Sequence, residues 1–486
     1  MKAVAVAALI VLAGCLSSQD GDAREPTIVP AMPIDLPPGC DGREPVHHKA
    51  GAVPTDGPRL FGCFHRIGTP SFEPSIGIDS EGAVYYYPAS GLGIPSTVQM
   101  ARSMDEGASW DILTPNLAGV PTHPYSQDPL LYLDPATDRI FAEDLLLVPP
   151  TCGMMSLSDD GGETWAHTQA GCMQTDHVSL FAGPPATSTT LGYPNVVYRC
   201  AISGGALVAT STQVTCQRSI DGGTTWLPPG TSPWTFLPGI VALPAGCDGG
   251  NGHGVVGPDG TVFLPRGHCG RPELAISTDE ALTWTVVQVS DLGNACGGGL
   301  CEHDAGVGID TAGTVYYAWV AADGLPYVAR SFDGGFTWDD PLMLAPPGVN
   351  EAGLIQMAVG GKGELAFAYL ATTTGPGDVA GDHSDTFWGA YMTVAQDADT
   401  DPTFTTLVLN ETGDPLIRGR CGPLRCGAVF DFIDVRIGPD GTPWAPFVDG
   451  CLTGCREGPD DGSEAVTGRV WGIDLWDGTD PNGPYP

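Results

Sequence analysis

Short apolar and β-branched segments recur along the chain, in pairs that flank a polar turn. The pattern is clearest at residues 76–86, 256–263, 307–317 and 437–444, where each turn contains Asp and Gly. Such turns between strand-forming residues are a strong signal for β-hairpins. The chain also contains 68 glycines and 45 prolines, which disfavour long helices. The sequence therefore predicts an all-β protein built from hairpins.

A second pattern, Ser-x-Asp-x-Gly-x-Ser/Thr-Trp, occurs five times at nearly constant spacing, and we name each copy an octet. The octets span residues 103–110, 158–165, 219–226, 277–284 and 331–338. The carboxylate can accept N–H groups of its own turn, the Gly supplies a positive φ, and the Trp packs between sheets. We interpret the octet aspartates as structural: Asp105, Asp160, Asp221, Asp279 and Asp333. Ala281 replaces the Gly in the fourth octet, so we expect distortion or strain there.

The hairpins and octets combine into repeating units. In each unit a hairpin is followed by a third strand that leads into the octet, and a fourth strand follows its Trp. Four antiparallel strands are the size of one propeller blade. Two units without an octet, at about 353–410 and 430–476, bring the number to seven. We predict a seven-bladed β-propeller; a six-bladed ring with one inserted unit is the alternative.

The octets resemble Asp-boxes, the repeats of bacterial neuraminidases and other sialidase-type propellers. The resemblance covers most of residues 60–476 and implies, for an enzyme, a glycoside hydrolase of sialidase type. Sialidases clamp a substrate carboxylate with three arginines, the first in an Arg-Ile-Pro motif before the first blade, and use a Tyr–Glu pair as nucleophile and an Asp as acid/base. Arg66 lies in an interrupted version of that motif, Arg-Ile-Gly-Thr-Pro. We assign no Tyr nucleophile.

Other charged residues could complete such a site. Further arginines lie in loops expected on the channel face or before the seventh unit: Arg266, Arg271, Arg418, Arg420 and Arg425. Some Asp-box propellers are seven-bladed glucan hydrolases that use two aspartates as acid and base. Asp128, Asp304 and Asp434 make such a pair available here. With Arg66, these three form our set of catalytic candidates.

Aligning the units on their first hairpins predicts a ring of polar residues at the channel mouth. Its members are Glu73, Asp128, His177, His253, Asp304, Gln356 and Asp434, with Asp176 and His303 as neighbours. The ring is open to three interpretations: structural support, binding of sugar hydroxyls, or a divalent metal such as Ca²⁺. A cofactor is therefore left open. The ligand-binding candidates are Glu73, His177, His253, His303, Arg266 and Arg271.

The N-terminus predicts export. Met1-Lys2 precedes an apolar run over residues 3–13, which is typical of a signal peptide. Leu12-Ala-Gly-Cys15 resembles the bacterial lipobox, which implies that Cys15 is acylated; an ordinary signal peptide is the alternative. We predict a signal peptide over 1–15, a flexible tether over 16–58 and the propeller over 59–480. The protein would then be extracytoplasmic and held at the cell membrane by lipid alone.

The cysteines indicate the cellular compartment of the protein, and the net charge limits its possible partners. Without Cys15, fourteen of the 15 cysteines remain, and oxidised pairs fit an extracytoplasmic protein. Their order suggests seven local pairs: Cys40/Cys63, Cys152/Cys172, Cys200/Cys216, Cys247/Cys269, Cys296/Cys301, Cys421/Cys426 and Cys451/Cys455. The net charge of −37 disfavours nucleic acid as a partner.

Two functions follow from these patterns. The first is a lipid-anchored, sialidase-like propeller that binds a glycan and could hydrolyse it. The alternative is a non-catalytic platform that binds a surface protein, a glycan or a metal ion.

Overall fold

The computed structural model divides the chain into two units, Met1–Pro37 and Pro38–Pro486, and most of the second is described below. The described residues are 36–51, 53–89, 98–115, 126–146, 153–170, 175–203, 212–236, 251–267, 271–293, 305–374, 386–419, 432–452 and 462–476. All regular elements among them are β-strands. Within these ranges no helix is long and apolar enough to cross a membrane.

The first four blades are consecutive antiparallel sheets of four strands. Blade 1 consists of β4 (Ser75–Ile78), β5 (Val84–Tyr87), β6 (Met100–Ser103) and β7 (Asp111–Leu113). Blade 2 consists of β8 (Ser126–Asp134), β9 (Arg139–Leu146), β10 (Gly153–Ser158) and β11 (Ala166–Ala170). Blade 3 consists of β12 (Thr175–Gly183), β13 (Val196–Ser203), β14 (Thr212–Ser219) and β15 (Thr235–Phe236). Blade 4 consists of β16 (Val255–Val256), β17 (Val262–Arg266), β18 (Glu273–Ser277) and β19 (Thr285–Gln288).

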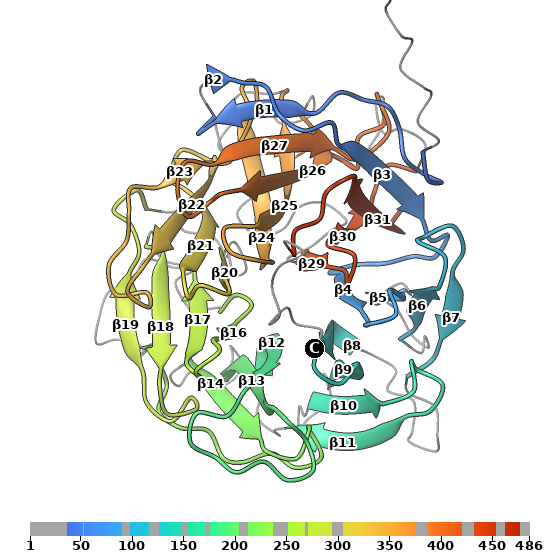
Figure 1. Ribbon diagram of the computed structural model, residues 1–486. Coiled ribbons are helices and arrows are strands. Elements are labelled where there is room, and N and C mark those ends of the chain that lie inside the picture. The colour runs from blue at the N-terminus through green and yellow to red at the C-terminus, as the bar shows by residue number, and fades with distance from the viewer. Residues whose placement is uncertain are drawn as a thin grey trace, which may run out of the picture. The chain divides into compact units, whose positions relative to one another are not determined.

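Three further blades complete the ring, with the first strand of each blade innermost (Figure 1). Blade 5 consists of β20 (Ala305–Ile309), β21 (Val315–Val320), β22 (Pro326–Ser331) and β23 (Leu342–Met343). Blade 6 consists of β24 (Glu351–Val359), β25 (Leu365–Thr372), β26 (Phe387–Gln396) and β27 (Thr403–Val408), with β28 (Ile417–Arg418) paired to β26. Blade 7 consists of β29 (Arg436–Ile437), β30 (Pro443–Asp449), β31 (Glu464–Trp471) and β3 (Phe61–Arg66). The predicted seven-bladed propeller is confirmed.

The N-terminal part of this unit closes the ring. Strand β3 pairs with β31 as the outermost strand of blade 7, so the two ends of the propeller share one sheet. Strand β1 (Val46–Lys49) pairs with β27 of blade 6, and β2 (Val53–Pro54) pairs with β1. Val46–Lys49 and Val53–Pro54 are therefore strands within the stretch 16–58 that we predicted to be a flexible tether. Their backbone N–H and C=O groups extend the edge of blade 6.

Two of the predicted cysteine pairs are disulfides in the structure. Cys40 is bonded to Cys63 of β3, and Cys200 to Cys216 across β13 and β14. Cys451 is also disulfide-bonded. The other proposed partners, and Cys15, lie outside the described residues.

Each octet connects the third and fourth strands of its blade and carries the same hydrogen bonds. In octet 5 the Ser331 hydroxyl donates to Asp333 and accepts the Gly335 N–H, at 2.8 and 2.9 Å. Asp333 also accepts the N–H and hydroxyl of Thr337, at 2.8 and 2.7 Å. The indole side chains pack against the clusters between blades, as predicted. Octets thus close the outer turns with groups only a few residues apart.

The fourth octet keeps this geometry without the glycine. Ala281 adopts a φ of +63° and its N–H still donates to the Ser277 hydroxyl, at 2.9 Å. The turn is therefore strained through the left-handed backbone of an alanine, but its hydrogen bonds are not distorted.

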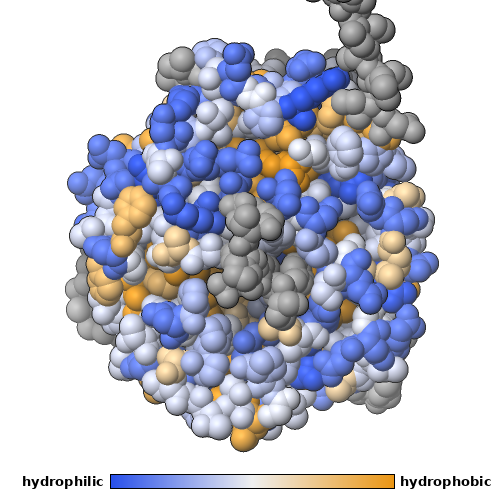
Figure 2. Space-filling model, viewed as in Figure 1, coloured by the Kyte–Doolittle hydropathy of each residue, from blue (hydrophilic) through white to orange (hydrophobic). Residues whose placement is uncertain are grey.

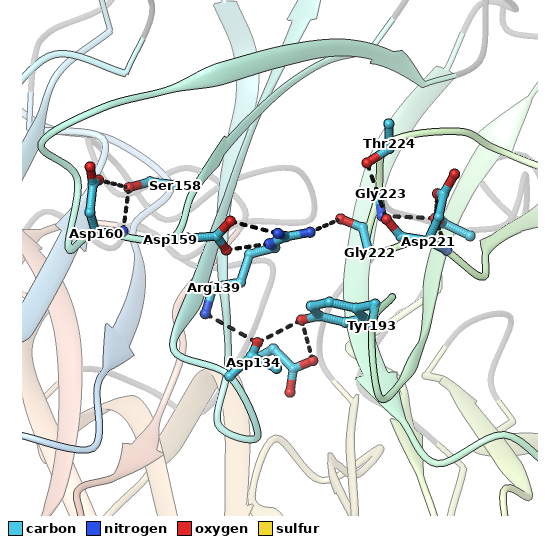
Figure 3. Close-up of polar contacts among 12 residues, drawn as sticks. Asp134, Arg139, Ser158, Asp159, Asp160, Tyr193, Asp221, Gly222, Gly223 and Thr224 are labelled. Atoms are coloured by element: carbon cyan, nitrogen blue, oxygen red, sulfur yellow. Dashed lines mark hydrogen bonds and ion pairs between the residues drawn. The ribbon is translucent and has the colours of Figure 1, made fainter. Parts of the chain in front are cut away.

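Octets of adjacent blades are also linked to one another (Figure 3). Arg139 of blade 2 pairs with Asp159 in octet 2 and donates to the Gly222 carbonyl in octet 3, at 2.9 Å. Its guanidinium lies 4.9 Å from the ring centroid of Tyr193, whose hydroxyl donates to the buried Asp134. These contacts fix blade 2 against blade 3. The face seen in Figure 2 is mostly hydrophilic, with scattered apolar side chains, which is consistent with the high net charge.

Candidate functional site

A cavity of about 300 Å³ occupies the centre of the ring and is lined by all seven inner strands. Most lining side chains are apolar or glycine, for example Gly77, Gly254 and Gly308. A Cβ at Gly308 would meet Val359 of the next blade, so glycine lets neighbouring inner strands approach closely. Polar lining side chains include His253, Gln356 and Arg436. The volume is at the lower end of small-molecule sites.

The charged residues at the cavity bear on the predicted ring. We expected a ring of acidic and imidazole side chains at the channel mouth; among the described residues that line the cavity, the one with a formal charge is Arg436. Asp434 and Glu73 are buried and do not line the cavity. The other carboxylates of the predicted ring lie outside the described side chains, so the acidic ring stays a prediction.

Three residues in or next to the predicted ring have a left-handed backbone. His177 and Leu354 lie in β-bulges of β12 and β24 and have φ values of +52° and +53°, and Glu73 before β4 has a φ of +45°. Gln356 comes two residues after Leu354. A bulge of this kind re-aims side chains and shifts the register. Our alignment on hairpins did not detect this shift.

One kind of hydrogen bond recurs between the inner strands of neighbouring blades. Asp434 accepts the N–H of Ile76, at 3.3 Å. In the same way Ser75 accepts the Leu131 N–H, at 2.8 Å, and Ser179 accepts the Gly254 N–H, at 3.0 Å. Each side chain thus satisfies the inner strand of the next blade, so part of the predicted ring has a structural role.

Blade 4 contributes two buried polar groups that lack partners. His253 forms a backbone bridge with Gly306 of blade 5, and its Nε2 atom has no hydrogen-bond partner. Asn251 is fully buried, and its Oδ1 atom also has no partner. Burying such atoms without a hydrogen bond costs about 1–3 kcal/mol each. The sequence analysis identified His253 but missed Asn251. Asn251 could have been identified by its position, because it precedes His253 by two residues just as the predicted Glu73 precedes Ser75 by two.

Blade 7 places an ion pair beside this histidine. Arg436 Nη1 lies 2.8 Å from Asp434 Oδ1, and Asp434 also accepts the Val435 N–H, at 2.8 Å. Burial lowers the pKa of His253; the Asp434 charge opposes this shift and the Arg436 charge adds to it. His253 is therefore neutral at pH 7 and offers one donor and one acceptor nitrogen. Arg436 was not among our candidates.

A second buried histidine, His177 of blade 3, lies against the segment that precedes blade 7. It is buried, and its ring centroid lies 5.5 Å from that of Phe432, which precedes blade 7. Glu73 is buried in blade 1. Blades 3, 4 and 7 thus meet near the channel through named side chains.

The arginines proposed for a clamp lie apart. Arg66 is on β3, at the outer edge of blade 7, and pairs with Asp449 and Glu464, both at 2.7 Å, and with Asp414 at 3.2 Å. Partial burial acts to lower its pKa, but the hydrogen bonds to Glu464 and Asp449 outweigh that effect and raise it. Arg66 thus belongs to an ion-pair network at the outer edge of blade 7, and its catalytic role stays a prediction.

The remaining described arginines have other surroundings. Arg266 is buried in blade 4, where it pairs with Glu273 at 3.5 Å and lies 5.3 Å from the Trp234 ring. Arg418 lies over the Phe387 ring in blade 6, and Arg271 is exposed before β18. Arg66, Arg266 and Arg418 thus lie on β3, β17 and β28, in three different blades.

Several candidates cannot be placed. The backbone of Asp128 lies at the bulge of β8, but its side chain is outside the described part of the structure, as is that of Asp176. His303, Asp304, Arg420 and Arg425 also lie outside it. Within the described ranges, no group of three or more His, Cys, Asp or Glu side chains could hold a metal.

Comparisons with known proteins give a similar architecture at low identity. No protein family and no curated protein matches the sequence. A protein of unknown function from Dyadobacter fermentans is 12% identical with a TM-score of 0.42, over 89% of this chain and 99% of that one. A leech intramolecular trans-sialidase is 13% identical with a TM-score of 0.39, over 82% of this chain and 68% of that one. The Aleuria aurantia lectin, in complex with a fucosyl sugar, is 11% identical with a TM-score of 0.42, over 71% of this chain and 96% of that one. Solved structures of this similarity thus include a trans-sialidase and a lectin, but TM-scores this low carry no argument about function.

Proposed function

We propose that this protein is an extracytoplasmic, lipid-anchored propeller of the Asp-box type that binds a carbohydrate in its central channel. The observation that carries the proposal is a pair of buried atoms without a hydrogen-bond partner among the described residues: Nε2 of His253, which lines the cavity, and Oδ1 of Asn251, two residues before it. A sugar hydroxyl both donates and accepts, so it can satisfy an amide oxygen and a neutral imidazole together. Binding would recover the free energy that these two atoms lose in the unliganded protein.

The apolar part of the cavity suits the same ligand class. Gln356 adds an amide beside the histidine, and Tyr132 and Trp476 supply aromatic surface. Sugar rings have apolar C–H faces as well as hydroxyl groups, and ligand sites combine apolar walls with few polar groups.

Binding is favoured over hydrolysis by the surroundings of two catalytic candidates. Arg66 already holds three carboxylates at the outer edge of blade 7. Asp434 is paired with Arg436 and accepts the Ile76 N–H, which leaves little capacity for acid or base chemistry.

The binding test is titration calorimetry with a panel of monosaccharides. We expect a saccharide to bind, and we expect His253→Ala and Asn251→Leu each to weaken binding at least tenfold. Arg66→Ala is the matched control, because it lowers stability but leaves the affinity unchanged. Binding that is equal in the His253→Ala variant, or absent across the panel, would overturn the proposal. Release of the aryl group from aryl glycosides would replace it with a hydrolase.

The lipid anchor has a separate test. When the full-length chain is produced in bacteria, we expect it to fractionate with membranes and to incorporate a labelled fatty acid. Cys15→Ser should abolish both, and retention of the label in that variant would exclude the predicted acylation.

A further inference from the structure

We infer that a second cavity, at the outer edge of blade 6, binds a small organic cation with an apolar body. The cavity lies where the segment before β1 meets β27 (Figure 1). Its volume of about 420 Å³ is within the range of small-molecule sites. The inference goes beyond the proposed function, because this cavity shares no lining residue with the central one.

The first argument is the apolar wall of this outer cavity. Three residues of the connection between β23 and β24 line it: Pro346, Pro347 and Val349. Val46 of β1 and Val408 of β27 also line it and are 43% and 38% exposed. A ligand with an apolar body would cover these valines, and removing their surface from water favours binding.

The second argument is a buried hydroxyl without a hydrogen bond. Tyr391 of β26 lines the outer cavity and is more than nine-tenths buried, and its ring stacks on Tyr369 with centroids 5.7 Å apart. Among the described residues, none forms a hydrogen bond with the Tyr391 hydroxyl. Burial raises the pKa of Tyr391, so the hydroxyl is protonated at pH 7 and can donate to a ligand. An acceptor atom on the ligand would supply the missing hydrogen bond.

The charges on the lining decide the class of ligand. Four lining residues have a formal charge: Asp41, Arg43, Glu44 and Glu411. Arg43 Nε lies 2.6 Å from Asp41 Oδ2, and its Nη atoms donate to two backbone carbonyls directly after β27. The guanidinium is therefore fully used within the protein. Glu44 and Glu411 form no ion pair with any residue that the structure describes.

These features complement an amine rather than an acid. An ammonium group would be attracted by the two unpaired carboxylates, Glu44 and Glu411, whereas an anion would be repelled by them. The rest of the ligand would lie against the prolines and valines, with a polar atom at Tyr391. An apolar cation that also carries a hydroxyl group meets all three requirements.

The test uses tyramine, which has an ammonium group, an aromatic body and a phenol oxygen. Its matched probes are 4-ethylphenol, which lacks the ammonium group, and 3-(4-hydroxyphenyl)propionate, which has a carboxylate instead. By titration calorimetry at pH 7 and low salt, we expect tyramine to bind about fivefold or more tightly than 4-ethylphenol. The propionate should bind more weakly than 4-ethylphenol. High salt should reduce these differences, because it screens the carboxylates.

Variants assign the binding to the outer cavity. The double variant Glu44→Gln, Glu411→Gln should remove the preference for tyramine and leave the affinity for 4-ethylphenol within twofold. Tyr391→Phe keeps the stacked ring, so it should fold; it should weaken tyramine about threefold or more and leave phenethylamine, which lacks the phenol oxygen, within twofold. Glu81→Gln removes an exposed carboxylate between β4 and β5 and is the control, with no change for any probe.

Several outcomes would overturn the inference. They are equal binding of tyramine and 4-ethylphenol, unchanged preference in the double variant, and absence of binding by every probe. Binding of an oligolysine peptide without binding of tyramine would also overturn it, in favour of a basic protein segment. The carbohydrate proposal stands or fails separately, because it is tested with sugars at His253 and Asn251.

Discussion

Blades 1–5 are closed by hydrogen bonds between residues that are close in sequence, whereas blades 6 and 7 depend on pairing between residues that are far apart in sequence. In blades 1–5 each outer turn is closed by an octet, whose hydrogen bonds join residues two to four positions apart. Blades 6 and 7 lack octets and are completed by the N-terminal strands β1 and β3, whose partners lie more than 350 residues away. Arg43 reinforces this region by donating to the carbonyls of Leu409 and Asn410, at 3.0 and 2.7 Å.

The difference shows how stability is divided in the ring. An octet is repeated, so the loss of one leaves four others in place. The closing region is unique, and Cys40–Cys63 ties its strand to the segment before β1. We therefore expect changes in the closing region to have larger effects than changes in an octet.

The largest effect is expected from removing the closing strand. A chain that begins at residue 67 lacks β3, the disulfide and the Arg66 ion pairs, and it leaves the edge of β31 open. We expect a loss of about 5 kcal/mol or more, comparable with the whole stability of a domain. Circular dichroism and size-exclusion chromatography should show an unfolded or aggregated protein.

A chain that begins at residue 38 is the control for this truncation. It keeps β1, β2 and β3 and should unfold at the temperature of the full chain. If the chain from residue 67 melted at the same temperature as this control, the closing role of β3 would be wrong.

An intermediate effect is expected from pH, and two of the buried histidines responsible lie in the closing region. Burial lowers the pKa of His65 on β3 to about 4; Arg469 adds to the shift and Asp105 and Glu106 oppose it. Burial likewise lowers the pKa of His48 on β1 to about 4. The unfolded chain takes up these protons first, so stability is full above pH 6.5 and falls between pH 6.5 and 4. Each histidine contributes about 2–4 kcal/mol to this loss.

The octets respond in a different pH range. Hydrogen bonds from the Thr337 hydroxyl and N–H lower the pKa of Asp333 to about 2, so this stabilisation is lost only as the pH falls from 3.8 towards 2. Thermal unfolding between pH 7 and 4 should therefore report on the buried histidines and not on the octets. His65→Leu should flatten that dependence, whereas His167→Leu in blade 2 should change it little. An unchanged slope in His65→Leu would exclude His65 as the titrating group.

The smallest effects are expected at one octet position. Gly335 has a φ of +91°, and an added Cβ would lie 2.9 Å from Leu274, so Gly335→Ala should cost about 1–3 kcal/mol. Ala281→Gly relieves the left-handed alanine but removes a buried methyl group, so we expect a net change within about 1 kcal/mol. Urea unfolding midpoints compare the two. A larger loss in Ala281→Gly than in Gly335→Ala would contradict our account of the turn.

The sequence was informative where structure depends on neighbouring residues. The octets and the Asp-containing hairpins predicted seven four-stranded blades, because each pattern determines its own turn. The local pairs Cys40/Cys63 and Cys200/Cys216 were predicted for the same reason.

Features that depend on distant residues were missed. Nothing in residues 61–66 indicates a partner at 464–471, so β3 was not assigned to blade 7. Arg436 was overlooked because only the folded ring places it beside His253, and Asn251 because its burial is not evident from the sequence. Their importance depends on burial and on absent partners, which a linear pattern does not reveal.

The pairing of β3 with β31 also has a consequence for biosynthesis. A ribosome makes residues 61–66 about 400 residues before residues 464–471, so the first of these strands has no partner while the intervening blades are synthesised. The seventh blade can therefore be completed only after β31 has left the ribosome. A nascent chain that stops before β31 would leave β3 without its partner strand. Quality-control proteases could recognise such an exposed, unpaired strand.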